Sequence, residues 1–390
     1  MTTKVVIMFL EKAYFFIFFK KKQYQMYLLK IYTFATNITY YKMKKIFILV
    51  FLLFLLVGKS FSQNVEAIAI GFYNLENLFD TINDPNLPDD EFTPTGPKLW
   101  NSKRYWHKIN NMAEVISKIA VDDKIGLKGL AVLGVSEVEN KRVLEDLVKA
   151  PPIKNFNYQI VHYESPDHRG IDVALLYNPK VFKVESSKQI PLIIKDNPDF
   201  KTRSQLVVVG KLGGEDFAFI VNHWPSRRGG EKKTRPYRIA AAKLAYSIID
   251  SLKKLNPNLK IILMGDLNDD PINKSIKKYL QSKGKEDKVR NNDLFNPFEK
   301  LFKMGVGTLA YRDNWNLFDN ILLTKSLLKT DKLDLQGWKY YKAKVFNPSF
   351  LKQKEGNFAG YPYRTFVGNH FMGGFSDHFP VYVILIRKTK

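Results

Sequence analysis

Polar side chains that could bind a metal ion or a phosphate group follow apolar, strand-like segments at six places in this chain. Asn74 follows the first such segment, and Glu137 closes another in Leu-Gly-Val-Ser-Glu-Val. A buried carboxylate without a partner is costly, so Glu137 is expected to meet a cation or a hydrogen-bond donor. Taken alone, Asn74 is more typical of a capping residue, and Glu137 of a helix cap or an ion pair.

The third place combines a histidine with arginines. His223 ends an apolar run in Asn-His-Trp-Pro, and Arg227 and Arg228 follow in the next loop, with Arg235 a few residues further on. Guanidinium groups beside a histidine suit an anion better than a cation, so phosphate is the expected ligand. The alternative is an interior histidine with solvated arginines.

Three further motifs bring acids, an amide and a second histidine. Asp266 and Asn268 stand in Gly-Asp-Leu-Asn after an apolar run, Asp319 lies inside an apolar run, and Asp377 and His378 precede the last one. Turn formation alone would explain Gly-Asp-Leu-Asn, and an ordinary polar loop could contain Asp-His. An acid inside an apolar strand, however, is expected to have a partner.

The segments between these motifs predict an α/β layered fold. Apolar spacings of three and four predict a helix over 105–120, and a second helix is expected from Arg238 to Leu255. Strands are expected near 65–73, 130–136, 157–163, 171–177, 205–211, 216–222, 259–264, 316–323, 339–346 and 380–386. No long linker separates them, so residues 64–390 are expected to form a single catalytic domain.

The first part of the chain resembles a targeting segment. Lys44 and Lys45 precede the apolar run Ile46–Val57, and Ser60-Phe61-Ser62 places small residues at a cleavage site. The run is shorter than the ~20 apolar residues that span a bilayer, which favours a cleaved signal over residues 43–62 rather than an uncleaved anchor. The protein is then expected to be secreted or periplasmic, and residues 1–42 to be an upstream segment outside the translated protein.

The chain is basic and has no cysteine. It has 61 Lys and Arg against 38 Asp and Glu, and removing the ten Lys and one Glu of residues 1–62 leaves 51 against 37. This charge attracts polyanions such as nucleic acids, although a lysine-rich surface can also serve solubility alone. Without cysteine there is no disulfide, and any metal must be held by oxygen and imidazole ligands.

In their order along the chain, the six motifs resemble the motif series of the endonuclease/exonuclease/phosphatase superfamily, over about residues 66–386. Gly-Asp-Leu-Asn and Ser-Asp-His are the most diagnostic parts. The resemblance implies an α/β fold in which two mixed sheets pack face to face with helices on the outer faces, the four-layer, deoxyribonuclease-like sandwich. It also implies a hydrolase that acts on phosphate esters.

The resemblance further implies roles for the motif residues. Glu137 would be the principal metal ligand, with Asn74 nearby and Asp377 completing the site. Asp266 would orient or deprotonate the attacking water, and Asn268 would hold a phosphate oxygen. His378, paired with Asp319, would contact the phosphoryl group or share the role of base, and His223 would stabilise the phosphate or protonate the leaving oxygen. Mg²⁺ or Mn²⁺, and less readily Ca²⁺, suit such oxygen-rich ligands.

The substrate class stays open between alternatives. A nuclease that cuts DNA or RNA is favoured by the basic charge and by Arg227, Arg228 and Arg235 as phosphate-binding residues. A loop expected at 96–107 adds residues that could pair with phosphates and stack on unpaired bases: Lys98, Trp100, Lys103, Arg104, Tyr105 and Trp106. The alternatives are a phosphatase, a phospholipid or inositol-phosphate phosphodiesterase, and a catalytically silent polyanion-binding protein. We expect a monomer with no obligate protein partner. Gly-x-Ser-x-Gly, His-Glu-x-x-His and phosphate-loop motifs are absent from the sequence.

Overall fold

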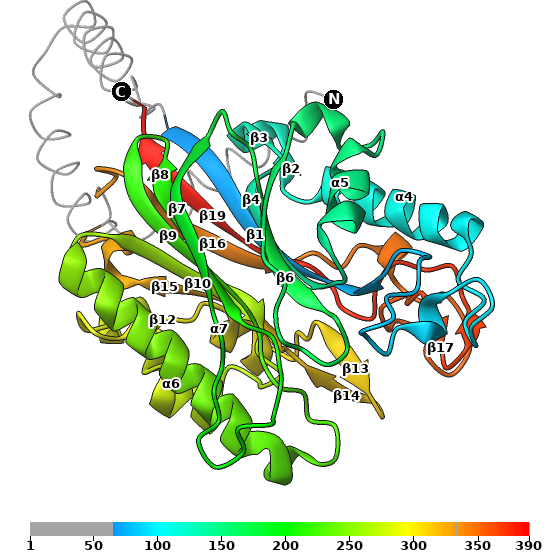
Figure 1. The fold of residues 1–390 in the computed structure, drawn as a ribbon. Helices are drawn as coiled ribbons and strands as arrows, with labels where there is room; N and C mark the ends of the chain where they lie inside the picture. Colours follow the sequence, from blue (N-terminus) through cyan, green and yellow to red (C-terminus); the bar gives the residue numbers. More distant parts are fainter. Residues whose placement is uncertain (1–64, 332–333, 390) are drawn as a thin grey trace, which may run out of the picture. The chain divides into compact units, whose positions relative to one another are not determined.

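Two β-sheets form the centre of the part of the chain that the computed structural model describes, residues 65–331 and 334–389 (Figure 1). The first sheet has the order β16 (Lys339–Val345), β19 (Val381–Lys388), β1 (Val65–Leu78), β4 (Leu130–Val138), β6 (Asp172–Tyr177) and β5 (Gln159–His162). The second has the order β11 (Ser282–Lys283), β12 (Leu294–Phe295), β15 (Asp319–Thr324), β10 (Lys260–Asp266), β9 (Glu215–His223), β8 (Gln205–Leu212) and β7 (Phe182–Ile190). The expectations for residues 1–42 and 43–62 lie outside the described residues.

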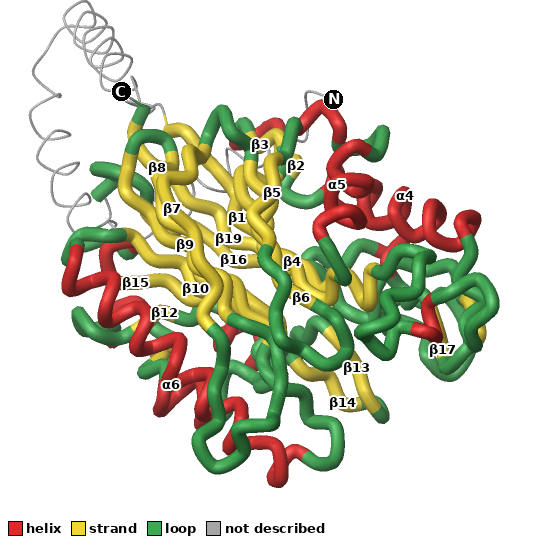
Figure 2. Tube along the Cα trace, in the orientation of Figure 1, coloured by secondary structure: helices red, strands yellow, loops and turns green. Residues whose placement is uncertain are grey.

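The sheets pack face to face, and helices cover their outer faces (Figures 1 and 2). Helices α4 (Ser102–Lys118) and α5 (Lys141–Lys149) share a buried apolar cluster with β1 and β4. The long helix α6 (Glu231–Leu255) packs on β9 and β10 from the other side. A third cluster between the sheets joins Ile70 and Val132 to Phe219 and Met264. The predicted two-sheet sandwich with outer helices is therefore confirmed.

Strand β1 shows why the apolar runs are continuous. Ala69 and Tyr73 point toward the cluster under the helices, whereas Ile70 and Phe72 point into the cluster between the sheets. Successive side chains of a strand point to opposite faces, so a strand covered on both faces must be apolar at nearly every position. The close approach of the sheets also requires Gly134, where an added Cβ would lie 2.6 Å from Met264 Sδ.

The sequence patterns did not predict strand β7 or helix α5, and helix α6 begins earlier than predicted. Strand β7 is a largely exposed edge strand, and α5 has only nine residues. Helix α6 begins at Glu231 and contains Pro236, so it starts seven residues before the predicted Arg238. A proline inside a helix removes a backbone hydrogen bond. The Arg235–Glu231 ion pair, with N–O distances of 2.8 and 2.9 Å, spans this first part of the helix.

Smaller elements complete the described chain: β2 (Val121–Asp122) with β3 (Leu127–Lys128), β13 (Leu309–Tyr311) with β14 (Asn314–Asn316), β17 (Phe366–Val367) with β18 (His370–Phe371), and helix α7 (Phe298–Lys303). Within residues 65–331 and 334–389, no helix is both long and apolar enough to span a membrane.

Candidate active site

The sheet topology gathers the predicted site residues at one edge of the sandwich. Strands β1 and β4 run parallel and bring Asn74 and Glu137 to their carboxyl ends. Strands β9 and β10 are also parallel, and their last residues, His223 and Asp266, are paired in register. Asp266 is in turn paired with Asp319, the first residue of the antiparallel strand β15. Residues far apart in the sequence thus meet at neighbouring strand ends.

A chain of buried polar groups links Asp319, His378 and Asp266. His378 Nδ1 lies 2.7 Å from Asp319 Oδ2, and its Nε2 lies 3.9 Å from Asp266 Oδ2. Burial alone would lower the pKa of His378, but the adjacent Asp319 carboxylate raises it well above the ordinary value. Burial raises the pKa of Asp266 to about 7, with His378 lowering it and Asp319 raising it. The imidazole is therefore held in one orientation, with its second nitrogen facing Asp266.

Glu137 and His223 face the same space from the other side. His223 Nε2 lies 3.8 Å from Glu137 Oε1 and 3.7 Å from Asp266 Oδ2. Glu137 has a left-handed backbone with φ of 59°, and its Oε2 accepts a 3.0 Å hydrogen bond from the Asn77 backbone N–H. A non-glycine residue in this conformation is strained, and such strain concentrates at functional sites. The hydrogen bond directs the remaining oxygen toward His223.

The protonation state of His223 follows from its surroundings. Burial lowers its pKa well below the ordinary value, and Arg203, Arg169 and His378 lower it further. Its Nδ1 is buried without a hydrogen-bond partner among the described residues. Because Nε2 faces two carboxylates, we assign a neutral imidazole with its proton on Nε2.

The side-chain amides of Asn74 and Asn268 are held by hydrogen bonds within the protein. Asn74 Nδ2 donates to Asp266 Oδ2 at 3.1 Å, and its Oδ1 accepts from the Glu76 N–H at 2.9 Å. Asn268 Nδ2 donates to the Trp224 carbonyl at 2.9 Å, and its backbone N–H donates to Asp266 Oδ1 at 2.9 Å. These bonds fix the Asp266 carboxylate at the centre of the group.

The arrangement fits a divalent cation. Asp266, Asp319 and His378 form a buried group whose ligand atoms lie within 4.8 Å of one another, and Glu137 adds a carboxylate across from Asp266. Asp319 Oδ1 is buried without a hydrogen-bond partner in the described chain. Carboxylate and amide oxygens are the ligands that hard cations prefer. Residues of this group, together with Glu137, could hold the ion.

The predicted ligand Asp377 lies beside an arginine. Arg364 Nη2 lies 2.6 Å from Asp377 Oδ2, and Arg364 Nε lies 3.4 Å from Glu76 Oε1. Glu76 is buried and also faces the buried Lys108 at 3.8 Å. Glu76, Lys108 and Arg364 were not predicted as site residues, although Glu76 stands only two residues after Asn74.

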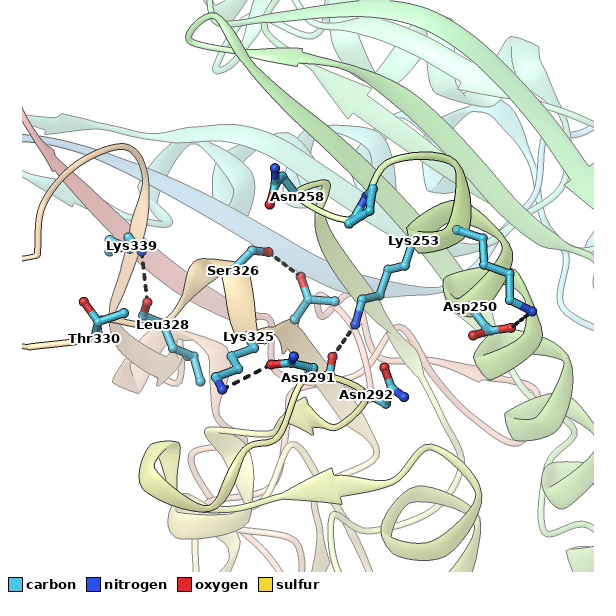
Figure 3. Close-up of a pocket in the computed structure, with 13 residues that line it drawn as sticks. Asp250, Lys253, Asn258, Asn291, Asn292, Lys325, Ser326, Leu328, Thr330 and Lys339 are labelled. Atoms are coloured by element: carbon cyan, nitrogen blue, oxygen red, sulfur yellow. Dashed lines mark hydrogen bonds and ion pairs between the residues drawn. The ribbon is translucent and has the colours of Figure 1, made fainter.

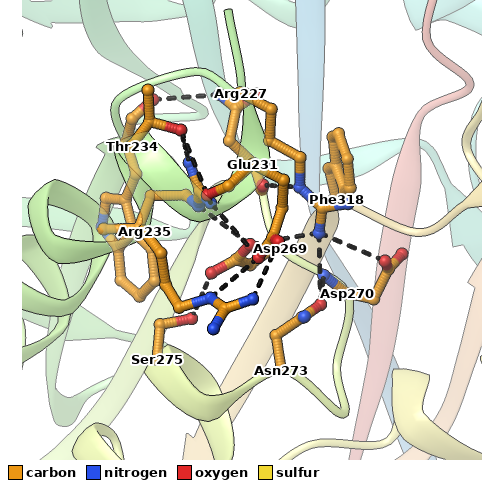
Figure 4. A network of polar contacts seen from close by, with 12 residues as sticks. Arg227, Glu231, Thr234, Arg235, Asp269, Asp270, Asn273, Ser275 and Phe318 are labelled. Carbon is orange, nitrogen blue, oxygen red and sulfur yellow. Dashed lines mark hydrogen bonds and ion pairs between the residues drawn. The ribbon is translucent and has the colours of Figure 1, made fainter. Parts of the chain in front are cut away.

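The three arginines predicted to bind phosphate differ in their surroundings, and Figure 4 shows those of Arg227 and Arg235. Arg227 donates to the Asn268 carbonyl at 2.9 Å and to Asp269 Oδ1 at 3.1 Å, and its guanidinium lies over Phe318. Arg235 makes two hydrogen bonds with Glu231. Their carboxylate partners indicate structural roles for Arg227 and Arg235. Arg228 is the exposed arginine of the three.

Arg169 is a further arginine at the site that was not predicted. Arg169 Nη2 donates to Asn77 Oδ1 at 2.6 Å, beside the residue that binds Glu137. Its loop is anchored by Asp167, whose Oδ1 accepts from the Arg169 N–H at 3.0 Å and whose Oδ2 lies 3.0 Å from the buried Arg203. Arg203 also donates to the His223 and Trp224 carbonyls at 3.2 and 2.6 Å. In the sequence, Arg169 is a single arginine in a loop, and no motif or regular spacing links it to His223.

A separate pocket of about 570 Å³ lies away from these residues (Figure 3). It is lined near the end of α6 and after β15, at the opposite end of β15 from Asp319. Its lysines are engaged within the protein: Lys325 Nζ donates to Asn291 Oδ1 at 3.2 Å, and Lys339 Nζ to the Leu328 carbonyl at 3.1 Å. No residue of the candidate site lines this pocket.

Comparisons with known proteins agree with this architecture. A model of the Endonuclease/Exonuclease/phosphatase family matches residues 69–387. Humanized D. rerio TDP2 superposes with a TM-score of 0.50 at 12% identity, covering 82% of this chain and 98% of its own, which shows the fold.

Two proteins of Bacteroides thetaiotaomicron are also similar in structure. An endonuclease/exonuclease/phosphatase family protein has a TM-score of 0.49 at 17% identity, over 84% of this chain and 100% of its own. The mannosyl-6-phosphatase Bt3783 has 0.48 at 17% identity, over 82% and 99%. No relative was found among curated proteins. By its family match, the chain belongs to the endonuclease/exonuclease/phosphatase family and is a hydrolase that acts on phosphate esters.

Proposed function

We propose that this hydrolase is a divalent-metal-dependent phosphodiesterase that uses direct attack of water and acts on nucleic acid. The observation that carries the proposal is the meeting of Glu137, Asp266, His223 and His378, with distances of 3.7 to 3.9 Å between their facing atoms. Hydrolysis of a phosphate ester needs an activated water, neutralised phosphoryl charge and assistance to the leaving oxygen. This group contains a residue suited to each task.

The roles follow from the geometry. Glu137 and Asp266, with the nearby Asn74, would hold Mg²⁺ or Mn²⁺, which when bound neutralises phosphoryl charge and lowers the pKa of water. Asp266 would accept the proton of the attacking water, since it is fixed by Asn74 and by the Asn268 N–H. His378, oriented by Asp319, would donate to a phosphoryl oxygen. Neutral His223 would donate from Nε2 to a second oxygen of the substrate.

Aromatic side chains that follow on from His378, with Trp315 and Phe358 exposed and Tyr361 half-buried, support a substrate that contains rings. Trp315 stacks on Phe379, which directly follows His378, with a centroid distance of 6.2 Å and an interplanar angle of 13°. Tyr361 lies 5.8 Å from Trp315, and Phe358 lies 5.6 Å from Tyr361. Bases of a single strand stack on such side chains. The aromatic row therefore suits a nucleotide next to the bond that is cut.

Of the three aromatic residues first expected to stack on bases, two are buried and Trp106 on α4 is exposed. Trp100 is 1% exposed and donates from Nε1 to the Phe79 carbonyl at 3.0 Å, and Tyr105 is also buried. They belong to the apolar cluster under α4 and α5. The expectation of base stacking by Trp100 and Tyr105 is thus wrong, because amphipathic packing places both in the core.

A small phosphomonoester is the competing substrate. The carboxylate partners of Arg227 and Arg235 favour it, because they remove two arginines from the track that a long polyanion would follow. The substrate classes can be separated by measuring kcat/KM with and without Mg²⁺. The compounds to compare are single-stranded DNA, RNA, an inositol phosphate, sphingomyelin, bis-p-nitrophenyl phosphate and p-nitrophenyl phosphate. We expect the oligonucleotide to have the highest kcat/KM and its KM to rise with salt. Faster cleavage of a monoester, or a KM independent of salt, would contradict the nucleic-acid assignment.

We also propose that the enzyme is exported as a monomer after cleavage near Ser62. The support is the pattern of Lys44, Lys45 and the apolar run that follows them. N-terminal sequencing of the exported protein should find Gln63 or Asn64 first, and a mature protein that keeps residues before Met43 would contradict this proposal.

A further inference from the structure

The pocket shown in Figure 3 carries more positive than negative charge. Its charged lining residues are four lysines and one aspartate: Lys253, Lys254, Lys325, Lys339 and Asp250. Two of these lysines have carboxylate partners. Lys254 Nζ lies 2.7 Å from Asp250 Oδ2, and Lys339 Nζ lies 2.9 Å from Asp334 Oδ2. Each of these carboxylates largely cancels the charge of its lysine, so the attraction of the pocket for an anion depends on the other two lysines.

Lys253 and Lys325 have only neutral partners in residues 65–331 and 334–389. Lys253 Nζ donates to the Asn291 carbonyl, and Lys325 Nζ donates to Asn291 Oδ1 at 3.2 Å. Figure 3 shows the two side chains approaching Asn291 from two sides. An ammonium group has three protons to donate, so each lysine keeps two for a further acceptor. Two uncompensated positive charges with free donors therefore line this pocket.

The two ammonium groups lie close together, since both of their acceptor oxygens belong to Asn291. Like charges at such a separation repel each other. Burial also lowers the pKa of Lys253, although Asp250 partly offsets this effect. An anion between the two lysines would remove the repulsion and accept hydrogen bonds from both, whereas a cation would be repelled.

Neutral donors and apolar surface complete the lining of the pocket. The side-chain amides of Asn258 and Asn292 line it and form no hydrogen bond within the described part of the chain, where only their backbone groups are engaged. Pro257 and Leu328 add apolar surface. The volume of about 570 Å³ lies in the range of pockets that hold small organic molecules. The pocket therefore has room for more than a bare ion.

We propose that this pocket is a second ligand site, in which Lys253 and Lys325 bind a phosphate group, either as the free ion or as a monoester on a small molecule. A lysine ammonium binds phosphate as a point charge, and the amides of Asn258 and Asn292 would donate to the remaining phosphate oxygens. The pocket lies at the opposite end of β15 from Asp319, and no residue of the candidate active site lines it. The ligand would therefore bind apart from the substrate.

Binding to the metal-free full chain tests the proposal without turnover. Inorganic phosphate and AMP are titrated by calorimetry in excess chelator at fixed ionic strength. The double variant Lys253→Gln/Lys325→Gln should bind the preferred compound at least about tenfold more weakly, because it loses two charge-assisted contacts. The matched control Lys183→Gln/Lys188→Gln removes two exposed lysines from β7, at the far edge of the same sheet, and should keep the wild-type affinity.

A second variant guards against a loss of folding, because Lys253 also holds the loop at Asn291. Asn258→Asp/Asn292→Asp places two negative charges in the pocket and removes no side-chain hydrogen bond of the described chain. It should also weaken phosphate binding, with an unchanged midpoint of urea denaturation. Phosphate held by the active-site group contributes equally to all these chains, so the differences between them report on the pocket.

The two compounds identify the source of the phosphate group. Tighter binding of AMP would assign the pocket to a phosphate monoester, and tighter binding of inorganic phosphate would assign it to the free ion. Wild-type affinity in either pocket variant, an equal loss in the β7 control, or no binding of either compound by the wild type would overturn the proposal. A chain that hydrolyses no phosphate ester would contradict the proposed function and leave this one standing, whereas the pocket variants should keep wild-type hydrolysis.

Discussion

Asp319 and His378 come from opposite sheets, 59 positions apart in the sequence, and their Oδ2 and Nδ1 atoms lie 2.7 Å apart in the core of the site. Asp319 begins β15, and His378 stands just before β19. The contact between Asp319 and His378 thus fixes the orientation of the His378 imidazole. Because this contact joins the two sheets, correct packing of the sheets is required to orient a predicted catalytic residue.

Replacing Asp319 by Asn should lower the pKa of His378, because the adjacent carboxylate is what raises it above the ordinary value. The raised pKa contributes stability that is complete below the ordinary value of about 6.5 and is lost as pH rises through the folded value, so the mutant should lose this part at neutral pH. NMR titration of the metal-free protein measures the shift. An unchanged His378 pKa would contradict the pairing.

The same pair should act as a unit in catalysis. Asp319→Asn and His378→Ala should each reduce kcat by about 10²-fold or more, the scale of a positioned acid or base. The double variant should be little worse than the worse single variant. Multiplication of the two single losses would show that the residues act independently.

Asp167→Asn should destabilise the fold by about 3–5 kcal/mol, because it leaves the buried Arg203 without its carboxylate. Arg203 also binds the His223 and Trp224 carbonyls, so the loss should disturb the end of β9. Urea denaturation measures the change. Asp123→Asn, which removes an exposed ion pair with Lys128, should leave stability unchanged, and equal effects of the two variants would refute the prediction.

Gly265→Ala should lower both stability and activity. An added Cβ would lie 2.2 Å from the Asn222 carbonyl oxygen, so β9 and β10 would have to separate next to His223 and Asp266. Strain of this kind costs about 1–3 kcal/mol. A variant with wild-type stability by urea denaturation and wild-type kcat would show that the close approach is not required.

Trp315→Ala should raise KM for a single-stranded oligonucleotide by a factor that corresponds to about 1–3 kcal/mol of stacking. Tyr341→Ala is the matched control, since Tyr341 is 53% exposed on β16 and lies outside the row of Trp315, Tyr361 and Phe358. Equal KM values for Trp315→Ala and the wild type would remove the support that this row lends to a nucleic-acid substrate.

Most of the fold could be predicted because burial on both faces imposes apolar runs, as in β1 and β10. The edge strand β7 gave no such signal, since much of it is exposed. Motif residues at strand ends could likewise be predicted. Arg364 could not, because only tertiary contact brings it to Glu76, 288 positions away. Arg235 lies close to His223 in the sequence, and in the structure it pairs with Glu231 on helix α6.

In the function that we propose, Glu137 supports metal-dependent hydrolysis at the edge where His223, Asp266 and His378 meet. The most direct measurement is the rate of bis-p-nitrophenyl phosphate hydrolysis against Mg²⁺ concentration for the wild type, Glu137→Gln and the exposed-residue control Glu185→Gln. We predict that chelator abolishes wild-type and control activity, that Mg²⁺ restores it, and that Glu137→Gln needs more Mg²⁺ and stays about 10²-fold slower. Full activity in excess chelator, or a Glu137→Gln curve that overlays the wild type, would contradict the account.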